Sequence, residues 1–285
     1  MIVPRNKAKQ PDPLMSLPTE DDLERDPAAA LASLPTEDDL PYSDECPMDS
    51  PWHRAAMNQL IDSIEQHWFG RKDFFVGGDM FVYFSPEHVF NKDFRGPDFF
   101  VVLNTNHDKP RKSWISWREK GKLPTVIVEL ASESTVHVDR GEKKRLYAEE
   151  FGTREYFIYD PATHTAEGWR LNDVGVYEPL NVDPSGRIAS HSLGMWIGPW
   201  KGTFQANRDT WPRFFTPSGD LVLTFAEAEK LRSTAEKKKA DAEKKKADTE
   251  KKKADAATKR ADAAEAELAR VRAELEALKQ SKRTK

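Results

Sequence analysis

The sequence predicts an α/β domain built around a central mixed β-sheet flanked by helices, followed by one long charged C-terminal helix. Nearly all Trp, Phe and Tyr residues lie within residues 51–225, so only this segment can build a large core. Inside it, apolar patterns follow the order helix, strands, helix, strands. After residue 225 the chain has a seven-residue repeat rich in Ala, Glu and Lys, which predicts the helix.

Composition gives the limits within which a function must be sought. The 285 residues carry a net charge of only −4, so charge alone gives no sign of nucleic-acid binding. An acidic nuclease stays open, because bound metal ions invert the local potential. No apolar run is long enough for a membrane span, and residues 1–7 lack the apolar stretch of a signal peptide. Cys46 is the only cysteine, which excludes an internal disulfide and a cysteine-rich zinc site and favours a cytoplasmic location.

These patterns divide the chain into three parts. Residues 1–50 are an acidic, Pro-rich leader that we expect to be mostly disordered. The folded domain is expected over residues 51–223, and the charged long helix over residues 224–285.

The leader contains an octapeptide twice. Ser-Leu-Pro-Thr-Glu-Asp-Asp-Leu occupies Ser16–Leu23 and again Ser33–Leu40. One duplication is far short of a solenoid. Two interpretations are open: an extended or disordered leader, or a segment that docks on the domain through Leu23 or Leu40. We favour disorder for the first copy only.

The first elements of the domain follow from apolar spacing. Apolar residues recur every three or four positions from Trp52 to Trp68, which predicts a helix. Phe74–Phe84 is predicted as a long strand with a bulge or bend at its Gly77-Gly78 pair. A short buried strand over Pro97–Leu103 follows.

Residues 104–124 are polar and predict a long loop or a short helix before a second buried strand, Thr125–Ala131. Asp139 and Glu142 have the spacing of a capping box, and they predict a helix that runs to about Glu150 and ends at Gly152. Three strands are predicted after it, at residues 155–161, 165–171 and 174–180.

In the tail, a heptad seam of apolar residues is strong only near the end. Its first half has Ala240 and Ala247 alone, which bury too little to hold two helices together. We therefore expect one long helix, with a weak homo-oligomer formed through a coiled coil in the last three heptads. The Lys-rich runs alternate with Asp and Glu and indicate a solvated helix rather than a nucleic-acid site. The seam near the end contains Leu268, Val271, Leu275 and Leu278.

Two acidic residues occupy places where a soluble protein normally has apolar ones. Asp98 heads the strand run Phe-Phe-Val-Val-Leu, and Glu129 lies inside Val-Ile-Val-Glu-Leu. A carboxylate in a buried strand costs several kcal/mol unless a cation or a hydrogen-bond donor offsets it. Carboxylates that hold Mg²⁺ or Mn²⁺ and a nearby lysine are what phosphodiester hydrolysis needs.

Lys143 is the candidate lysine. It lies four residues after Asp139 and four before Tyr147, so the three share one helix face, which the aromatic ring should turn towards the sheet. Asp79 follows the Gly pair and is either an accessory acid or the end of a bulge. Structural explanations also exist: Asp98 as a turn residue, Asp139 as a helix cap and Lys143 as a solvated charge.

At these residues the chain resembles a family, the Uma-type restriction endonucleases of the PD-(D/E)XK nuclease superfamily. The similarity covers about residues 34–200 and, more loosely, the tail. It rests on Gly96-Pro97-Asp98, Val128-Glu129-Leu130-Ala131-Ser132, Asp139-Arg140-Gly141-Glu142-Lys143, Tyr147-Ala148, Gly152, Glu155-Tyr156, Asp160, Gly78-Asp79-Met80 and the leader segment Leu34–Asp44.

The resemblance implies a restriction-endonuclease-like core and a Mg²⁺- or Mn²⁺-dependent endonuclease acting on DNA. By position, Asp98 and Glu129 match the superfamily's metal-binding acids. The superfamily expects Lys two residues after Glu129, where this chain has Ala131. In the Uma-type branch a lysine on the following helix substitutes, and Lys143 is the match. Asp79 and Tyr147 are then accessory residues. The alternative is a catalytically silent nuclease fold that binds nucleic acid or assembles through its tail.

Overall fold

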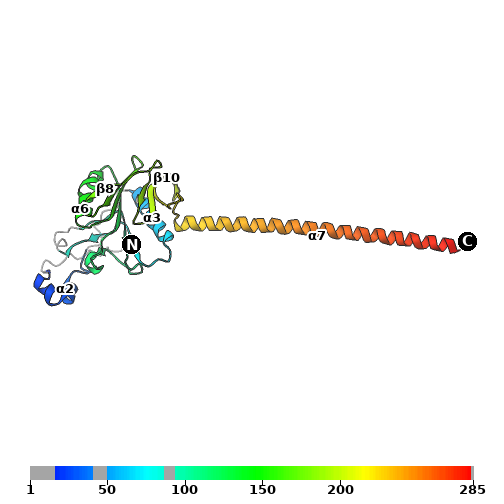
Figure 1. The fold of residues 1–285 in the computed structure, drawn as a ribbon, viewed down its shortest axis with the longest axis horizontal. Helices are drawn as coiled ribbons and strands as arrows, with labels where there is room; N and C mark the ends of the chain where they lie inside the picture. Colours follow the sequence, from blue (N-terminus) through cyan, green and yellow to red (C-terminus); the bar gives the residue numbers. More distant parts are fainter. Residues whose placement is uncertain (1–16, 41–49, 87–93, 284–285) are drawn as a thin grey trace, which may run out of the picture. The chain divides into compact units, whose positions relative to one another are not determined.

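The computed structural model of the chain describes residues 17–40, 50–86 and 94–283. The chain divides into two compact units, Met1–Phe225 and Ala226–Lys285 (Figure 1). The first unit contains every β-strand of the described part, and the second is a single helix.

The first unit is organised by a six-stranded sheet in the order β1-β3-β5-β6-β7-β8. All neighbouring strands are antiparallel except β5 and β6, which are parallel, so the sheet is mixed as predicted. The bounds are Phe74–Gly77 for β1, Phe99–Leu103 for β3, Val126–Leu130 for β5, Glu155–Asp160 for β6, Thr165–Leu171 for β7 and Tyr177–Pro179 for β8.

Alternate residues of the central strands enter two different cores. On β5, Val126 and Val128 pack with helix α3 (Pro51–His67), whereas Ile127 packs on the opposite face with Tyr147 and Phe151. This period of two is the ordinary geometry of a strand buried on both faces. Glu129 therefore shares the face of Ile127.

A second sheet covers α3. It contains β9 (Ile188–Ser190), β10 (Met195–Phe204) and β11 (Asn207–Phe215), all antiparallel. Trp52 of α3 stacks on Trp211 of β11 at 5.6 Å between ring centroids, and Figure 1 shows α3 beside β10. The burial of these aromatic rings fixes the helix between the two sheets.

The helix that carries Lys143 differs from the predicted one. It begins at Val136 rather than at Asp139, as α5 (Val136–Val138), continues as one π-helical turn over Asp139–Lys143, and ends as α6 (Lys144–Glu149). The predicted capping box at Asp139 is wrong, because the turn Ser132–Thr135 before it already starts the helix. The Oγ1 of Thr135 accepts from the Ser132 amide at 3.2 Å.

The predicted long strand Phe74–Phe84 is interrupted at its Gly pair. The chain leaves the sheet after Gly77 and forms β2 (Val82–Tyr83), which pairs in parallel with β4 (Trp114–Ile115). A short 3₁₀ helix, Ser116–Arg118, follows β4 in the predicted loop. The bend at Gly77-Gly78 places the β2–β4 layer against β3, the strand that directly follows Asp98.

Gly78 is required by close approach of the backbone. A Cβ atom at this position would lie 2.4 Å from the Asp98 carbonyl oxygen and 2.7 Å from Met57 Cγ. We expect Gly78→Ala to lower the free energy of unfolding by about 1–3 kcal/mol and to displace Asp98. Gly141→Ala is the matched control, since nothing lies within 4 Å of its Cβ position. Urea denaturation of both variants measures this, and equal stabilities would contradict the crowding.

The described part of the leader holds two short helices, α1 (Glu20–Arg25) and α2 (Pro27–Ser33). We expected little regular structure here; local side-chain caps supply it, with Thr19 capping α1 and Asp26 capping α2. After α2 the second octapeptide copy lies on the domain, and Leu40 is buried with Phe81, Tyr83, Ile115 and Trp117.

The tail is one helix, α7 (Phe225–Arg283), as the Ala, Glu and Lys repeat predicts (Figure 1). Leu268, Val271 and Leu275 are about half exposed along it. The side chain of Leu278, the last residue of the predicted seam, lies outside the described residues. Of the helices described, none has the length and apolarity that crossing a membrane requires.

Candidate active site

Asp98 and Glu129 are neighbours across two paired strands. In the antiparallel pair β3–β5, Phe99 lies opposite Val128, so the next pair outward joins Asp98 and Glu129. Phe100 and Ile127 belong to one core, and by the two-residue period Asp98 and Glu129 lie on that same face. Side chains at directly opposite positions in antiparallel strands lie close together. The pairing register thus brings the two predicted acids to one place.

The backbone of each strand binds the acid of the other. The Leu130 amide donates to Asp98 Oδ2 at 2.7 Å, and the Asp98 amide approaches Glu129 Oε2 at 3.4 Å. Burial, and secondly the charge of Glu129, raise the pKa of Asp98 well above its ordinary value, although the Leu130 amide and Lys143 oppose the shift. Such a pair of close acids is stable as two anions only beside a cation.

Lys143 lies between two buried carboxylates. Its Nζ is 3.2 Å from Glu129 Oε2 and 2.8 Å from Asp139 Oδ1. Burial alone would lower the pKa of Lys143, but the charges of Glu129 and Asp139 outweigh it and raise that pKa. The neighbouring Lys144 lies elsewhere, 3.8 Å from the ring centroid of Trp169. Lys143 is therefore held as an ammonium ion against Glu129.

Tyr147 lies on the same helix and is completely buried. Its hydroxyl donates to Glu129 Oε1 at 2.8 Å, which fixes the orientation of that carboxylate. Burial, then the Glu129 charge, raise the pKa of Tyr147 well above its usual range, so the hydroxyl keeps its proton as a donor. One helix thus supplies both groups that hold Glu129.

We expect Tyr147→Phe to lower the free energy of unfolding by about 1–2 kcal/mol, because a buried carboxylate loses a hydrogen bond while the ring is kept. Differential scanning calorimetry measures the change. Tyr177→Phe is the matched control, since its hydroxyl donates at 2.9 Å to a backbone carbonyl, that of Thr153, and leaves no carboxylate unpaired. A smaller loss for Tyr147→Phe than for Tyr177→Phe would contradict the role of Tyr147.

Asp79, the predicted accessory acid, is exposed and has a backbone φ of 48°. Its amide donates to the Pro97 carbonyl at 3.1 Å, so its backbone adjoins the turn that leads to Asp98. Asp in left-handed conformation is typical of a bend. Asp79 thus supports the Asp98 turn through its backbone.

The donor set suits magnesium. Magnesium binds one or two protein carboxylates and keeps waters and substrate phosphate oxygens as its other ligands. Asp98 and Glu129 provide two carboxylates whose mutual repulsion a cation would relieve. Within residues 17–40, 50–86 and 94–283, no group of three or more His, Cys, Asp or Glu side chains could hold a metal ion. A Mg²⁺ ion held by these two carboxylates would take its other ligands from water and substrate.

Two residues of this region have contacts that our sequence reasoning did not assign. Asp139, interpreted as a helix cap, is buried and pairs with Lys143. Its four-residue spacing from Lys143 was the available signal. His53 lies with Nε2 3.4 Å from the carbonyl oxygen of Ala131, and its Nδ1 is 2.8 Å from Ser50 Oγ. No spacing pattern pointed to His53.

Comparison with known proteins finds similarity over part of the chain. A curated relative, "Uncharacterized protein slr1290" from Synechocystis sp., is 28% identical over 107 residues, 38% of this chain and 53% of that protein. The chain thus matches about half the length of this relative. A crystal structure of "a putative nuclease belonging to DUF820" from Anabaena variabilis matches with a TM-score of 0.38 and 14% identity, over 52% of this chain and 76% of that one.

A family model assigns the chain more directly. The model of Uma2, described as "Putative restriction endonuclease", matches residues 44–199. The matched segment contains both strand acids, Lys143 and Tyr147. Because this match covers more than half of the sequence, the chain belongs to the Uma2 family.

Proposed function

We propose that this protein is a metal-dependent endonuclease that hydrolyses phosphodiester bonds in DNA, with Mg²⁺ or Mn²⁺ as cofactor. The observation that carries the proposal is the contact of Lys143 with Glu129 at 3.2 Å, beside Asp98 on the same sheet face. Asp98 and Glu129 would hold the cation. When bound, such an ion makes a water nucleophilic and neutralises charge on the attacked phosphate.

The remaining residues of the site have supporting roles in this proposal. The Lys143 ammonium orients the attacking water and places positive charge near the phosphate. Asp139 keeps Lys143 charged and in place, and Tyr147 keeps the Glu129 carboxylate in its rotamer. Asp79 acts through the backbone turn that positions Asp98.

Plasmid nicking tests the assignment. Supercoiled plasmid is incubated with the full chain and Mg²⁺ or Mn²⁺, and the wild type is compared with Asp98→Ala and Glu129→Ala. Glu133→Ala is the matched control, because Glu133 is an exposed acid four residues from Glu129. We expect nicking by the wild type and the control and a loss of at least about 100-fold in both site variants. Nicking that persists in both variants would contradict the site. No nicking of DNA or RNA by the wild type would favour a catalytically silent nucleic-acid-binding or assembly module.

We also propose a weak association of chains through the end of α7. Leu268, Val271 and Leu275 are about half exposed on one helix, and three heptads are marginal for a stable coiled coil. Sedimentation of the full chain should show concentration-dependent association that is lost when the chain ends at Glu229 or carries Leu268→Glu and Leu275→Glu. Identical association in all three would show that the tail does not assemble the protein.

The single cysteine, Cys46, which lies outside the described residues, agrees with the cytoplasmic location that we propose.

A further inference from the structure

The second octapeptide copy docks on the β2–β4 layer, at a site formed by Phe81, Tyr83, Ile115 and Trp117 together with Lys112 and Arg118, which we call the groove. Leu40 is buried there against Phe81, Tyr83, Ile115 and Trp117. These apolar contacts hold the carboxyl end of the octapeptide.

Polar groups of the groove recognise the rest of the peptide. Trp117 Nε1 donates to the Pro35 carbonyl at 3.0 Å, and the Arg118 guanidinium donates to the Leu34 carbonyl. Lys112 Nζ pairs with Asp38 Oδ1 at 3.0 Å. The groove therefore contacts four groups of the octapeptide: the Leu40 side chain, the Leu34 and Pro35 carbonyls and the Asp38 carboxylate.

The first copy has the same sequence and forms the same turn. In the second copy, the Thr36 amide and hydroxyl lie 2.9 Å and 2.7 Å from Asp39 Oδ2, and the Asp39 amide donates to the Thr36 carbonyl at 3.1 Å. In the first copy, the corresponding distances between Thr19 and Asp22 are also 2.9, 2.7 and 3.1 Å. The first copy thus shares the Thr–Asp turn of the docked copy, and it differs in continuing from this turn as helix α1.

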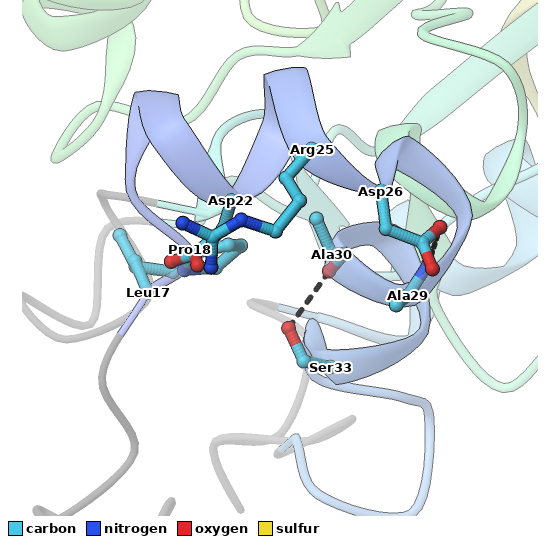
Figure 2. Close-up of a pocket in the computed structure, with 8 residues that line it drawn as sticks. All are labelled: Leu17, Pro18, Asp22, Arg25, Asp26, Ala29, Ala30 and Ser33. Carbon is cyan, nitrogen blue, oxygen red and sulfur yellow. Dashed lines mark hydrogen bonds between the residues drawn. The ribbon is translucent and has the colours of Figure 1, made fainter.

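The described part of the first copy lines a hollow within the leader. Leu17 and Pro18, which correspond to the recognised Leu34 and Pro35, line an open hollow of about 400 Å³ between α1 and α2 (Figure 2). The hollow is lined only by leader residues, the others being Asp22, Arg25, Asp26, Ala29, Ala30 and Ser33.

We propose that the groove is a binding site for the peptide Ser-Leu-Pro-Thr-Glu-Asp-Asp-Leu, and that the two copies of one chain exchange in it. Exchange replaces the connection of residues 41–50 to α3 by the longer connection of residues 24–50. Closing the longer loop costs more conformational entropy, which makes docking of the first copy about four- to fivefold less populated than docking of the second. The first copy should therefore occupy the groove in roughly a fifth of the chains. Docking within a chain is favoured over docking between chains by its high effective concentration.

Cross-linking distinguishes the two registers. In a full chain with Cys46→Ser, a short bismaleimide is applied to three variants that share Lys112→Cys. Asp38→Cys reports the second copy in the groove, and Asp21→Cys, at the equivalent position, reports the first. Asp26→Cys is the matched control, a leader acid outside both copies. We expect cross-linking within single chains for Asp38→Cys, and for Asp21→Cys at several times the yield of the control.

Two perturbations test the exchange further. Adding Leu40→Ala should raise the Asp21→Cys yield and leave the control unchanged. In the chain that retains Leu40, an excess of the synthetic octapeptide should lower the Asp38→Cys yield, and a scrambled peptide should not. An Asp21→Cys yield equal to the control in both backgrounds, or cross-links only between chains, would overturn the proposal. So would an octapeptide no more effective than the scrambled one.

Discussion

Lys143→Met is expected to reduce divalent-metal-dependent cleavage by at least about 100-fold and the free energy of unfolding by about 3 kcal/mol. The ammonium lies between Glu129 and Asp139, whose side chains are 0% and 2% exposed. Removing one partner of a buried ion pair leaves a buried charge without compensation. The stability loss therefore comes from the two acids rather than from the aliphatic part of the lysine, which methionine largely replaces.

A second substitution separates the structural role of Lys143 from its chemical role. Adding Asp139→Asn to Lys143→Met removes one of the two uncompensated acids and should restore part of the stability. It should restore none of the cleavage, since the ammonium beside Glu129 is still missing. Urea denaturation and plasmid nicking on the same preparations measure both. If activity returned together with stability, Lys143 would have only a structural role.

Glu119→Gln, a change outside the site, is expected to lower the free energy of unfolding by about 3 kcal/mol. Glu119 Oε1 and Oε2 accept from Arg111 at 2.9 and 3.0 Å, and Oε1 also accepts from Lys109. The Arg111 side chain is 0% exposed and lies 4.8 Å from the ring centroids of both Phe75 and Trp114. Without the Glu119 charge, this buried guanidinium would keep its hydrogen bonds to the Asn106 and Lys109 carbonyls but lose its counter-charge. The matched control is Glu149→Gln, whose partner Arg145 is 72% exposed; it should change stability by less than about 0.5 kcal/mol.

The same pair has a pH signature. Burial alone would raise the pKa of Glu119, but Arg111 and Lys109 outweigh it, and the net shift is below the ordinary value of 4.5. A lowered pKa in the folded state means that the native protein binds fewer protons than the unfolded chain. The stabilisation is therefore fully present above about 4.5 and is lost as the pH falls through the folded-state pKa. Denaturation across this acid range should show a smaller decline for Glu119→Gln than for wild type. An equal loss of stability in the two proteins as the pH falls would show that groups other than Glu119 cause the acid sensitivity.

The two strand acids could be predicted because local pattern and tertiary position agree. Val-Ile-Val-Glu-Leu is buried whichever sheet it joins, so Glu129 had to have a partner, and the structure supplies Tyr147, Lys143 and the Asp98 amide. Lys143 was predictable from helix periodicity, because its face is fixed by Tyr147 four residues later.

Other features depended on information that the local sequence lacks. Asp139 and Glu142 have the spacing of a capping box, and the same spacing also occurs inside a helix. Two β-branched residues, Val136 and Val138, obscured the true start. No strands were predicted after Leu180, because Gly198, Pro199, Gly202 and Pro212 interrupt the patterns of β10 and β11. The hairpin pairing of these two strands, which starts at Phe204 and Asn207, compensates for those weak local preferences.

The π-helical turn over Asp139–Lys143 has a consequence for how this site can change by mutation. A π turn contains one residue more than the α-helical path over the same length, and Gly141 lies in its middle. The buried Tyr147 anchors the helix on the carboxyl side. Deletion of Gly141 alone would therefore convert this turn into an ordinary α-helical one and keep the residues on its two sides in phase. Asp139 and Lys143 would then be three positions apart and would still share one helix face. The length of this segment can therefore change by one residue while Lys143 and Tyr147 keep their places beside Glu129, so relatives with and without the extra residue could carry the same candidate site.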